Sequence, residues 1–313
     1  MSAIVRFEDV YRHFGDREVL RGLSFRVEPG EIYALLGRNG AGKTTALRIL
    51  LGFLEPHAGR ATVLGSKSAD MPASLRSRIG YVSEGHRLYG TMRIRDCVAF
   101  EAGTRPGFRR SFVEHALKRC ALSPDQRVLR LSRGQRAQVS LILSVAEEPE
   151  LLVFDDPAMG LDVVMRREFL DAMIDVLSGE GTSVLFSSHI LPDVERIADR
   201  VGILHDGCIL LDATLDEVKT RFSKRHWIPA SEQVSPRELP AVVRARRRRE
   251  GYDLLLLDAN GDAEARLRTD GARLGPPLRL SLEELFLDLI GPERPGLLSE
   301  PVRELQQNME VSS

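Results

Sequence analysis

The sequence contains little cysteine and no long apolar run, and each lack excludes a class of protein. Its three cysteines, Cys97, Cys120 and Cys208, are far apart and do not have the spacing of metal ligands. We therefore expect neither a zinc site nor a disulfide framework, and a reducing compartment fits better. No stretch approaches the roughly 18 apolar residues that cross a bilayer, and the first residues lack the apolar core of a secretory signal. Any role at a membrane would depend on a partner protein.

An excess of charge of one sign is also absent. The 313 residues carry a formal net charge of −1, with 44 Lys and Arg against 45 Asp and Glu. This balance gives no reason to expect nucleic acid as a partner. Hydrophobic residues make up 43% and charged residues 28%, which is typical of a packed globular protein. A chain of this length suggests about two domains.

The apolar pattern predicts an α/β fold. Residues 4–27 alternate like short antiparallel strands, and residues 71–140 have mainly helical spacing. Apolar runs at 31–36, 151–154 and 183–186 read as strands of a parallel sheet that is buried on both faces. Asp206-Gly207, between two further apolar runs, predicts a hairpin.

A shift in composition near Phe222 divides the chain. Prolines then mark a linker, and strand and helix patterns return before the end. We expect a first domain over residues 1–222, with a helical subdomain at about 86–140. A small α/β accessory domain is expected over 223–291, and a disordered tail over 292–313.

A complete phosphate-binding loop follows the first apolar strand and precedes a helical pattern. Its glycines permit backbone conformations in which successive N–H groups point at phosphate oxygens. Lys43 is placed to reach the β and γ phosphates, and the Thr44 hydroxyl to bind Mg²⁺. The residues predicted to bind ATP here are Gly37, Arg38, Asn39, Gly40, Ala41, Gly42, Lys43, Thr44 and Thr45.

A second element is an apolar strand, residues 151–154, that ends in Asp155 and Asp156. The carboxyl ends of parallel strands meet at one edge of the sheet, so these carboxylates are expected beside the phosphate loop. Asp155 would then hold Mg²⁺.

A third element, Leu131-Ser132-Arg133-Gly134-Gln135, lies between these two in the sequence. It resembles the signature motif of the ATP-binding cassette (ABC) family, with Arg133 in place of the usual second glycine. The resemblance covers about residues 3 to 220 and implies a P-loop NTPase core of ABC ATPase type, with an antiparallel β portion and a helical subdomain. It also implies that two subunits pair head to tail. ATP on Lys43 of one chain then meets signature residues of the other: Ser132, Arg133, Gly134 and Gln135.

The resemblance assigns further positions. Phe14 matches the aromatic residue that stacks on adenine, and His189 matches the switch histidine that contacts the γ-phosphate. Asp162 lies in a loop that crosses between the subunits. Glu84 stands where the family has a glutamine that contacts Mg²⁺ and the attacking water. Asp156 stands at the position of the catalytic carboxylate.

The segments around His189 and Asp206-Gly207 resemble those of the ATPase subunits of bacterial ABC-2-type exporters, as does the helix pattern near residue 285. This branch implies an integral membrane permease as partner and a second copy of an ABC ATPase, most simply of this chain. It implies a cytoplasmic protein, bound through the permease to the inner face of the membrane. ATP and Mg²⁺ are the expected cofactors, and hydrolysis of ATP would drive export.

Two departures from the family bear on the mechanism. Asp156 replaces a glutamate and is shorter by one C–C bond, about 1.5 Å, so it is expected to be a slower base or to need a shift of the backbone. Glu84 replaces a glutamine, which keeps the length but adds a negative charge. Neutral drift and partial compensation for Asp156 both remain open for Glu84.

The sequence bears on two other functions. A soluble ABC protein of DNA repair or translation is disfavoured, because the chain has one phosphate loop and too few residues between Thr44 and Leu131 for a long coiled coil. A nucleotide-gated module with little turnover stays open as an alternative function because of Asp156.

The basic run from Arg244 to Arg249 would suit a surface that binds anionic lipid or nucleic acid. Such runs are commonly solvated, however, and we expect this one to form a solvent-exposed strand edge or turn.

Overall fold

The computed structural model describes residues 2–177, 181–230, 236, 239, 241–257, 267–268 and 272–291. The chain forms two compact units, Met1–Ile209 and Leu210–Ser313, and each is described by itself. The predicted boundary at residue 222 remains a prediction, since strand β10 and helix α8 lie between the two positions. The tail predicted over 292–313 lies outside the described residues.

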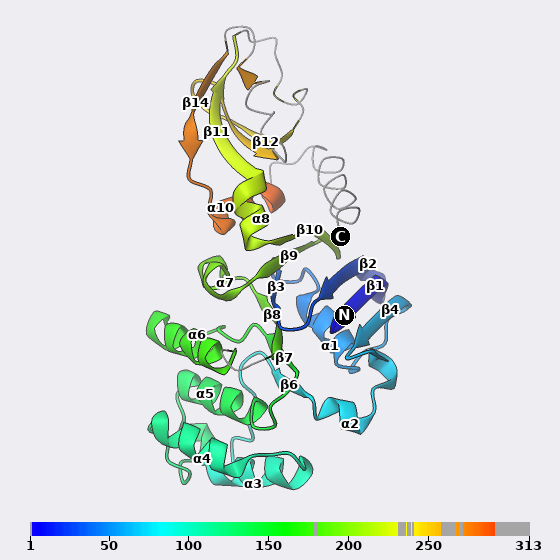
Figure 1. The fold of residues 1–313 in the computed structure, drawn as a ribbon, viewed down its shortest axis with the longest axis vertical. Helices are drawn as coiled ribbons and strands as arrows, with labels where there is room; N and C mark the ends of the chain where they lie inside the picture. The colour runs from blue at the N-terminus through cyan, green and yellow to red at the C-terminus, as the bar shows by residue number, and fades with distance from the viewer. Residues whose placement is uncertain are drawn as a thin grey trace. The chain divides into compact units, whose positions relative to one another are not determined.

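A six-stranded sheet forms the centre of the first unit, in the order β10-β9-β3-β8-β7-β6 (Figure 1). The pairs β3–β8, β3–β9, β6–β7 and β7–β8 are parallel. Strands β7 and β8 are buried at every residue, as expected for strands covered on both faces. The strands are β3 (Ile32–Leu36), β6 (Ile79–Val82), β7 (Leu151–Asp155), β8 (Ser183–Ser188), β9 (Arg200–His205) and β10 (Cys208–Thr214).

Residues 71–140 are mainly helical, as the sequence predicts, but they also contain strand β6, which the pattern does not predict. Ile79 pairs with Leu151 and Val82 with Phe154, so these four residues form the edge strand of the parallel sheet. They are too few to show either period clearly, and tertiary pairing decides their conformation. The predicted hairpin at Asp206-Gly207 is confirmed by its positive φ angles of 48° and 82° and by the strands β9 and β10 that flank it.

A smaller antiparallel sheet has the order β2-β1-β4-β5, and it confirms the antiparallel β portion. Its buried side chains, among them Phe7, Leu20 and Leu23, join those of β3 and α1 in one core. Phe14 is the last residue of β1 and pairs with Arg17 of β2. The strands are β1 (Val5–Phe14), β2 (Arg17–Val27), β4 (Ala58–Val63) and β5 (Ser66–Lys67).

The helices of the first unit fall into two groups. Helices α3, α4 and α5 gather at one end of the unit (Figure 1) and enclose a core of their own around Ile94, Val113 and Val139. The others connect the strands. The helices are α1 (Lys43–Leu50), α2 (Ala73–Arg76), α3 (Ile94–Thr104), α4 (Arg110–Arg119), α5 (Arg133–Ser144), α6 (Val163–Leu177) and α7 (Leu191–Ile197), with 3-10 turns η1 (Ser68–Asp70) and η2 (Val128–Arg130).

The second unit contains an antiparallel sheet in the order β12-β13-β11-β14. One face buries Trp227, Leu254 and Leu256. The basic run ends strand β12: Arg244 Nη1 donates to Asp288 O at 2.7 Å, and Arg248 Nε donates to Asp253 Oδ2 at 2.6 Å. The elements are α8 (Leu215–Arg221), β11 (Phe222–Ile228), β12 (Val242–Arg247), β13 (Tyr252–Leu257), β14 (Arg273–Leu278) and α10 (Leu282–Ile290).

Candidate active site

The phosphate-binding loop connects β3 to α1, as the sequence predicts. Gly42 is the N-cap residue of α1 and has a φ of 111°, which an L side chain rarely adopts. A Cβ at this position would also lie 2.8 Å from Leu20 Cδ2. The glycine therefore allows α1 to begin against the antiparallel sheet, with its positive N-terminus directed at the loop.

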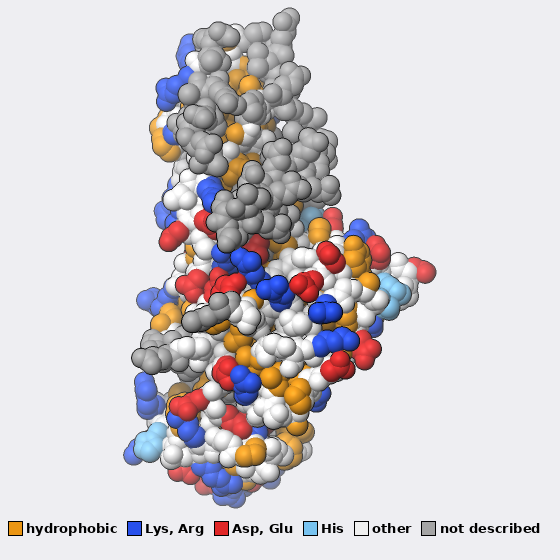
Figure 2. Space-filling view, turned by 45° about the vertical axis from the view of Figure 1, so that its right-hand side comes forward, with side chains coloured by type: hydrophobic (Ala, Val, Ile, Leu, Met, Phe, Trp, Pro, Cys, Tyr) orange, Lys and Arg blue, Asp and Glu red, His pale blue; other side chains and the backbone are white. Residues whose placement is uncertain are grey.

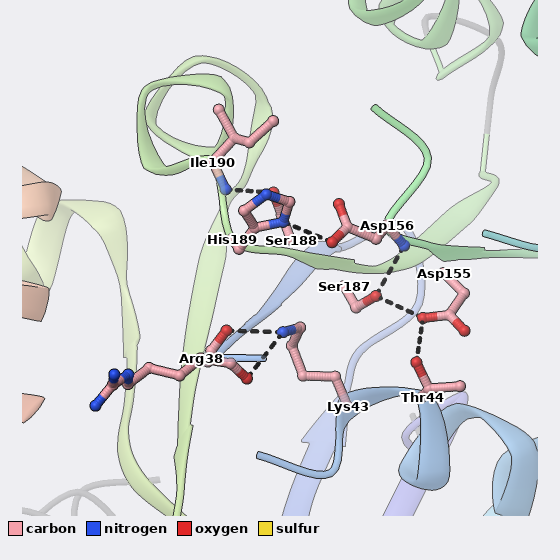
Figure 3. A network of polar contacts seen from close by, with 10 residues as sticks. Arg38, Lys43, Thr44, Asp155, Asp156, Ser187, Ser188, His189 and Ile190 are labelled. Atoms are coloured by element: carbon pink, nitrogen blue, oxygen red, sulfur yellow. Dashed lines mark hydrogen bonds and ion pairs between the residues drawn. The ribbon is translucent and has the colours of Figure 1, made fainter. Parts of the chain in front are cut away.

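Lys43 folds back into the loop that precedes it (Figure 3). Its Nζ donates to Gly37 O at 2.7 Å and to Arg38 O at 3.3 Å, and its side chain is buried. Burial lowers the pKa of Lys43, while the charges of Asp156, Asp155 and Glu84 act in the opposite direction. Neutral backbone carbonyls accept the hydrogen bonds of the ammonium group here, so phosphate oxygens can replace them without an ion pair being broken.

Thr44 and Asp155 meet at the end of β7. Thr44 Oγ1 donates to Asp155 Oδ1 at 2.9 Å, and Ser187 Oγ donates to the same oxygen at 3.0 Å. Hydroxyl and carboxylate oxygens are the ligands that Mg²⁺ prefers, and this ion usually keeps waters and takes phosphate oxygens as well. Within the described residues, no group of three or more Asp, Glu, His or Cys side chains is arranged to hold a metal ion. The pair therefore suits a cation shared with a phosphate substrate rather than one enclosed by protein.

Asp156 and His189 contact each other just past the ends of β7 and β8. His189 Nδ1 lies 2.6 Å from Asp156 Oδ2, and the Asp156 backbone N–H donates to Ser187 Oγ at 2.9 Å. Asp156 is only 8% exposed, and its Oδ1 has no hydrogen-bond partner in the described part of the chain. Burial raises the pKa of Asp156, against the opposing effects of His189 and Lys43. This buried carboxylate has one oxygen oriented by histidine and the other free for a proton or a water.

Charged side chains of both signs are interspersed over the described face of the first unit in Figure 2. This face therefore offers an anionic substrate no broad surface of one charge sign. Glu84 follows β6 and forms no hydrogen bond or ion pair with described residues. Its charge nevertheless raises the pKa of Lys43, so it acts on the same site.

The signature segment begins helix α5 and does not join this network. Ser132 caps the helix: its Oγ accepts from Gln135 N at 3.1 Å, and Gln135 Oε1 accepts from Ser132 N at 3.0 Å. A Cβ at Gly134 would overlap Met165 of α6, and Arg133 Nη1 donates to Gly160 O at 3.5 Å. Among described residues, no hydrogen bond or ion pair connects this segment to the phosphate loop.

The crossing-loop residue Asp162 has a local role. Its Oδ1 accepts from Val164 N at 3.0 Å and from Met165 N at 2.9 Å, so it caps the start of α6.

Phe14 is 47% exposed at the end of β1. The structure thus brings Lys43, Thr44, Asp155, Asp156 and His189 together with the loop that begins at Gly37. The hydrogen bonds of the signature segment and of Asp162 are local to α5 and α6.

Ser187 is a residue of this site that the sequence motifs do not predict. It is fully buried and connects Asp155 with the backbone of Asp156. The sequence does contain a sign of its role, because two serines, Ser187 and Ser188, end an otherwise apolar strand directly before His189.

Comparisons with known proteins all point to one family. A family profile described as "ABC transporter" matches residues 20–159. An uncharacterized ABC transporter ATP-binding protein of Methanocaldococcus jannaschii is 30% identical over 92% of this chain and 100% of its own length. The Nod factor export ATP-binding protein I of Rhizobium etli is 35% identical over 66% of each chain.

Solved structures agree. One, described as the ATP binding subunit of an ABC transporter, is 28% identical, covers 69% of this chain and 92% of its own, and has a TM-score of 0.62. In the described residues, no helix is both long and apolar enough to cross a membrane. The phosphate loop, the carboxylate pair and these similarities together identify the chain as an ATP-binding subunit of the ABC transporter family, and as an ATPase.

Proposed function

We propose that this chain hydrolyses MgATP to drive a separate membrane permease, and that the process is export. The observation that carries the catalytic part is one connected network in which Thr44, Asp155, Ser187, Asp156 and His189 are linked by hydrogen bonds beside Lys43. This network supports the assignment of Asp155 as a cation ligand, Asp156 as the base and Lys43 as the phosphate-binding cation, because phosphoryl transfer needs these groups close together.

In this mechanism, the ammonium of Lys43 leaves the carbonyls of Gly37 and Arg38 and binds the β and γ phosphates. Thr44, Asp155 and Glu84 would hold Mg²⁺, which neutralises charge on the phosphates when bound. Backbone N–H groups of residues 38–45 hold the triphosphate, and Phe14 provides a surface for adenine. Substrate binding thus uses side chains from β1, the loop and β7.

Asp156 is the base in this proposal. It accepts a proton from a water whose oxygen bonds to the γ phosphorus, while the bond from that phosphorus to the bridging oxygen breaks and ADP leaves. The raised pKa of Asp156 makes it a stronger base than an ordinary aspartate. His189 holds one carboxylate oxygen at 2.6 Å, which leaves Oδ1 to face the water.

The site would be completed by a second copy. Ser132, Arg133, Gly134 and Gln135 begin a helix whose N-terminus suits a phosphate, yet none of them bonds to the phosphate loop of its own chain. A partner subunit is therefore the natural source of nucleotide for this segment, and Asp162 would lie near the same interface.

The permease, the export direction and a place on the inner face of the cell membrane are inferred from the relatives. One relative is named for the export of Nod factor. The exporter proposal predicts that the chain co-purifies from membranes with a polytopic protein encoded beside it, and that vesicles carrying both accumulate a substrate only with hydrolysable ATP.

The test of the catalytic part is simpler. The purified chain should bind ATP with Mg²⁺ and hydrolyse it, and Lys43→Ala should abolish both. If the nucleotide affinity of Lys43→Ala is unchanged, the assignment of residues 37–44 as the ATP-binding loop is wrong. Lys67→Ala is the matched control, because it makes the same substitution at an exposed lysine outside the site.

A further inference from the structure

The end of strand β1 carries an arginine that none of the steps above uses. The Arg12 guanidinium carbon lies 4.8 Å from the centroid of the Phe14 ring. This is inside the about 6 Å at which a cation is attracted to the negative face of an aromatic ring. Phe14 is 47% exposed, so the ring presents surface to solvent as well as to Arg12.

A loop anchors Arg12 from the other side. Arg12 Nη1 donates to Glu55 O at 2.9 Å, and its Nε is buried with no hydrogen-bond partner in the described residues. The same loop fastens the strand, because His57 N donates to Tyr11 O at 2.9 Å. The rings of His13 and His57 also stack, with centroids 3.6 Å apart. This loop follows helix α1, so Arg12 connects Phe14 to the helix that begins with Lys43.

A second contact leads to the phosphate loop itself. Arg17 pairs with Phe14 across the hairpin, and Arg17 Nη2 donates to Gly40 O at 3.4 Å. Arg17, Val19 and residues 38–41 line part of a pocket of about 520 Å³, within the range of small-ligand sites. Arg17 thus borders this pocket, contacts the phosphate loop through Gly40 and pairs with Phe14 at the end of β1.

We propose that Arg12 is a positioning residue for the base of the nucleotide: it holds the Phe14 ring by a cation–π contact while the Glu55 carbonyl holds Arg12. The inference rests on the proposed function, since it takes Phe14 as the surface on which adenine stacks. Arg12 touches no phosphate in this arrangement and acts only through the ring. A ring already fixed loses less freedom when adenine binds, which strengthens binding.

The experiment compares ATP with inorganic tripolyphosphate, which has the phosphates but no base. Calorimetry with Mg²⁺ measures both ligands on the wild type, Arg12→Met, Arg12→Lys, Phe14→Ala and the double variant of Arg12→Met with Phe14→Ala. Arg6→Met is the matched control, because Arg6 is an exposed arginine of the same strand that pairs with Glu8 instead. Thermal unfolding checks that each variant is folded.

Arg12→Met should weaken ATP binding about two- to fivefold, because the Phe14 ring must then be ordered when adenine binds, and should leave tripolyphosphate binding unchanged. Arg12→Lys should recover part of the loss, Arg6→Met should show none, and Arg12→Met should add nothing in the Phe14→Ala background. Equal losses for both ligands, no loss for ATP, or a loss that persists without Phe14 would each overturn the inference. If Phe14→Ala itself leaves ATP binding intact, the adenine surface fails first, which separates the two ideas.

Discussion

The replacement of Asp156 by glutamate restores the residue that the ABC family usually has, and the structure predicts that it lowers the rate of hydrolysis. The Asp156 carboxylate already reaches His189 at 2.6 Å. Its backbone has a φ of 46° and donates to Ser187, and the side chain is almost fully buried. The site is therefore built for the shorter side chain, with little free space toward His189.

The magnitude follows from the added length. One further C–C bond adds about 1.5 Å, which would carry the carboxylate into the His189 ring unless the side chain turns aside. A misplacement near 1 Å costs about 10²-fold in rate, so Asp156→Glu should slow turnover by about 10- to 100-fold. Asp156→Asn, which removes the base and keeps the shape, should slow it by at least about 10²-fold, or about 2.7 kcal/mol of barrier.

Single-turnover hydrolysis of radiolabelled ATP, in the presence of the membrane partner, measures both variants, and calorimetry checks that ATP binding persists. Asp171→Asn is the control, because Asp171 is an exposed carboxylate of α6 that pairs with Arg196. Faster hydrolysis by Asp156→Glu would refute the argument from space. Wild-type rates in Asp156→Asn would show that Asp156 is not the base and that the low-turnover alternative should be tested through His189.

Four further outcomes are expected. Lys43→Ala should lose most of its ATP affinity by calorimetry, and unchanged affinity would contradict the role of its ammonium group. Mixing Lys43→Ala with Ser132→Arg subunits should restore ATP-dependent dimerisation, measured by light scattering; no gain over either variant alone would exclude a site shared between chains. Ser187→Ala should lower the free energy of unfolding by about 1–3 kcal/mol in denaturant titration, because the buried Asp156 N–H loses its acceptor, and an unchanged midpoint would contradict this. The acid limb of the pH–rate profile should lie above that of an ordinary aspartate, because burial raises the pKa of Asp156. The same shift makes the folded state bind this proton more readily than the unfolded chain, so its stabilising effect is present at low pH and is lost as the pH rises through the folded pKa; Asp156→Asn should remove both dependences.

Much of the candidate active site could be predicted because it depends on short, contiguous motifs. The loop from Gly37 to Thr44 fixes backbone geometry locally, and an apolar strand ending in Asp155 fixes the edge of a parallel sheet. Each of these patterns is contained within a few residues. The fold then brings the two segments together, so that Thr44 Oγ1 lies 2.9 Å from Asp155 Oδ1.

Other features could not be read in this way because they depend on pairs distant in sequence. Strand β6 is decided by its pairing with β7 rather than by its own four residues. Arg12 meets the Glu55 carbonyl across 43 residues, and a backbone acceptor leaves no mark on the identity of residue 55. The family resemblance places Asp162 in a loop that crosses between subunits, while its capping of α6 is visible only in the hydrogen bonds that it accepts.

The direction of the hydrogen bonds around Asp155 has a consequence for metal entry. Thr44 and Ser187 both give their single hydroxyl protons to Asp155 Oδ1, so the lone pairs of the Thr44 oxygen remain available. A divalent cation that binds Thr44 therefore needs no rotation of this hydroxyl, because its proton already points away toward a carboxylate. Serine at position 44 would preserve this orientation, whereas valine would keep the shape and lose both the donor and the ligand.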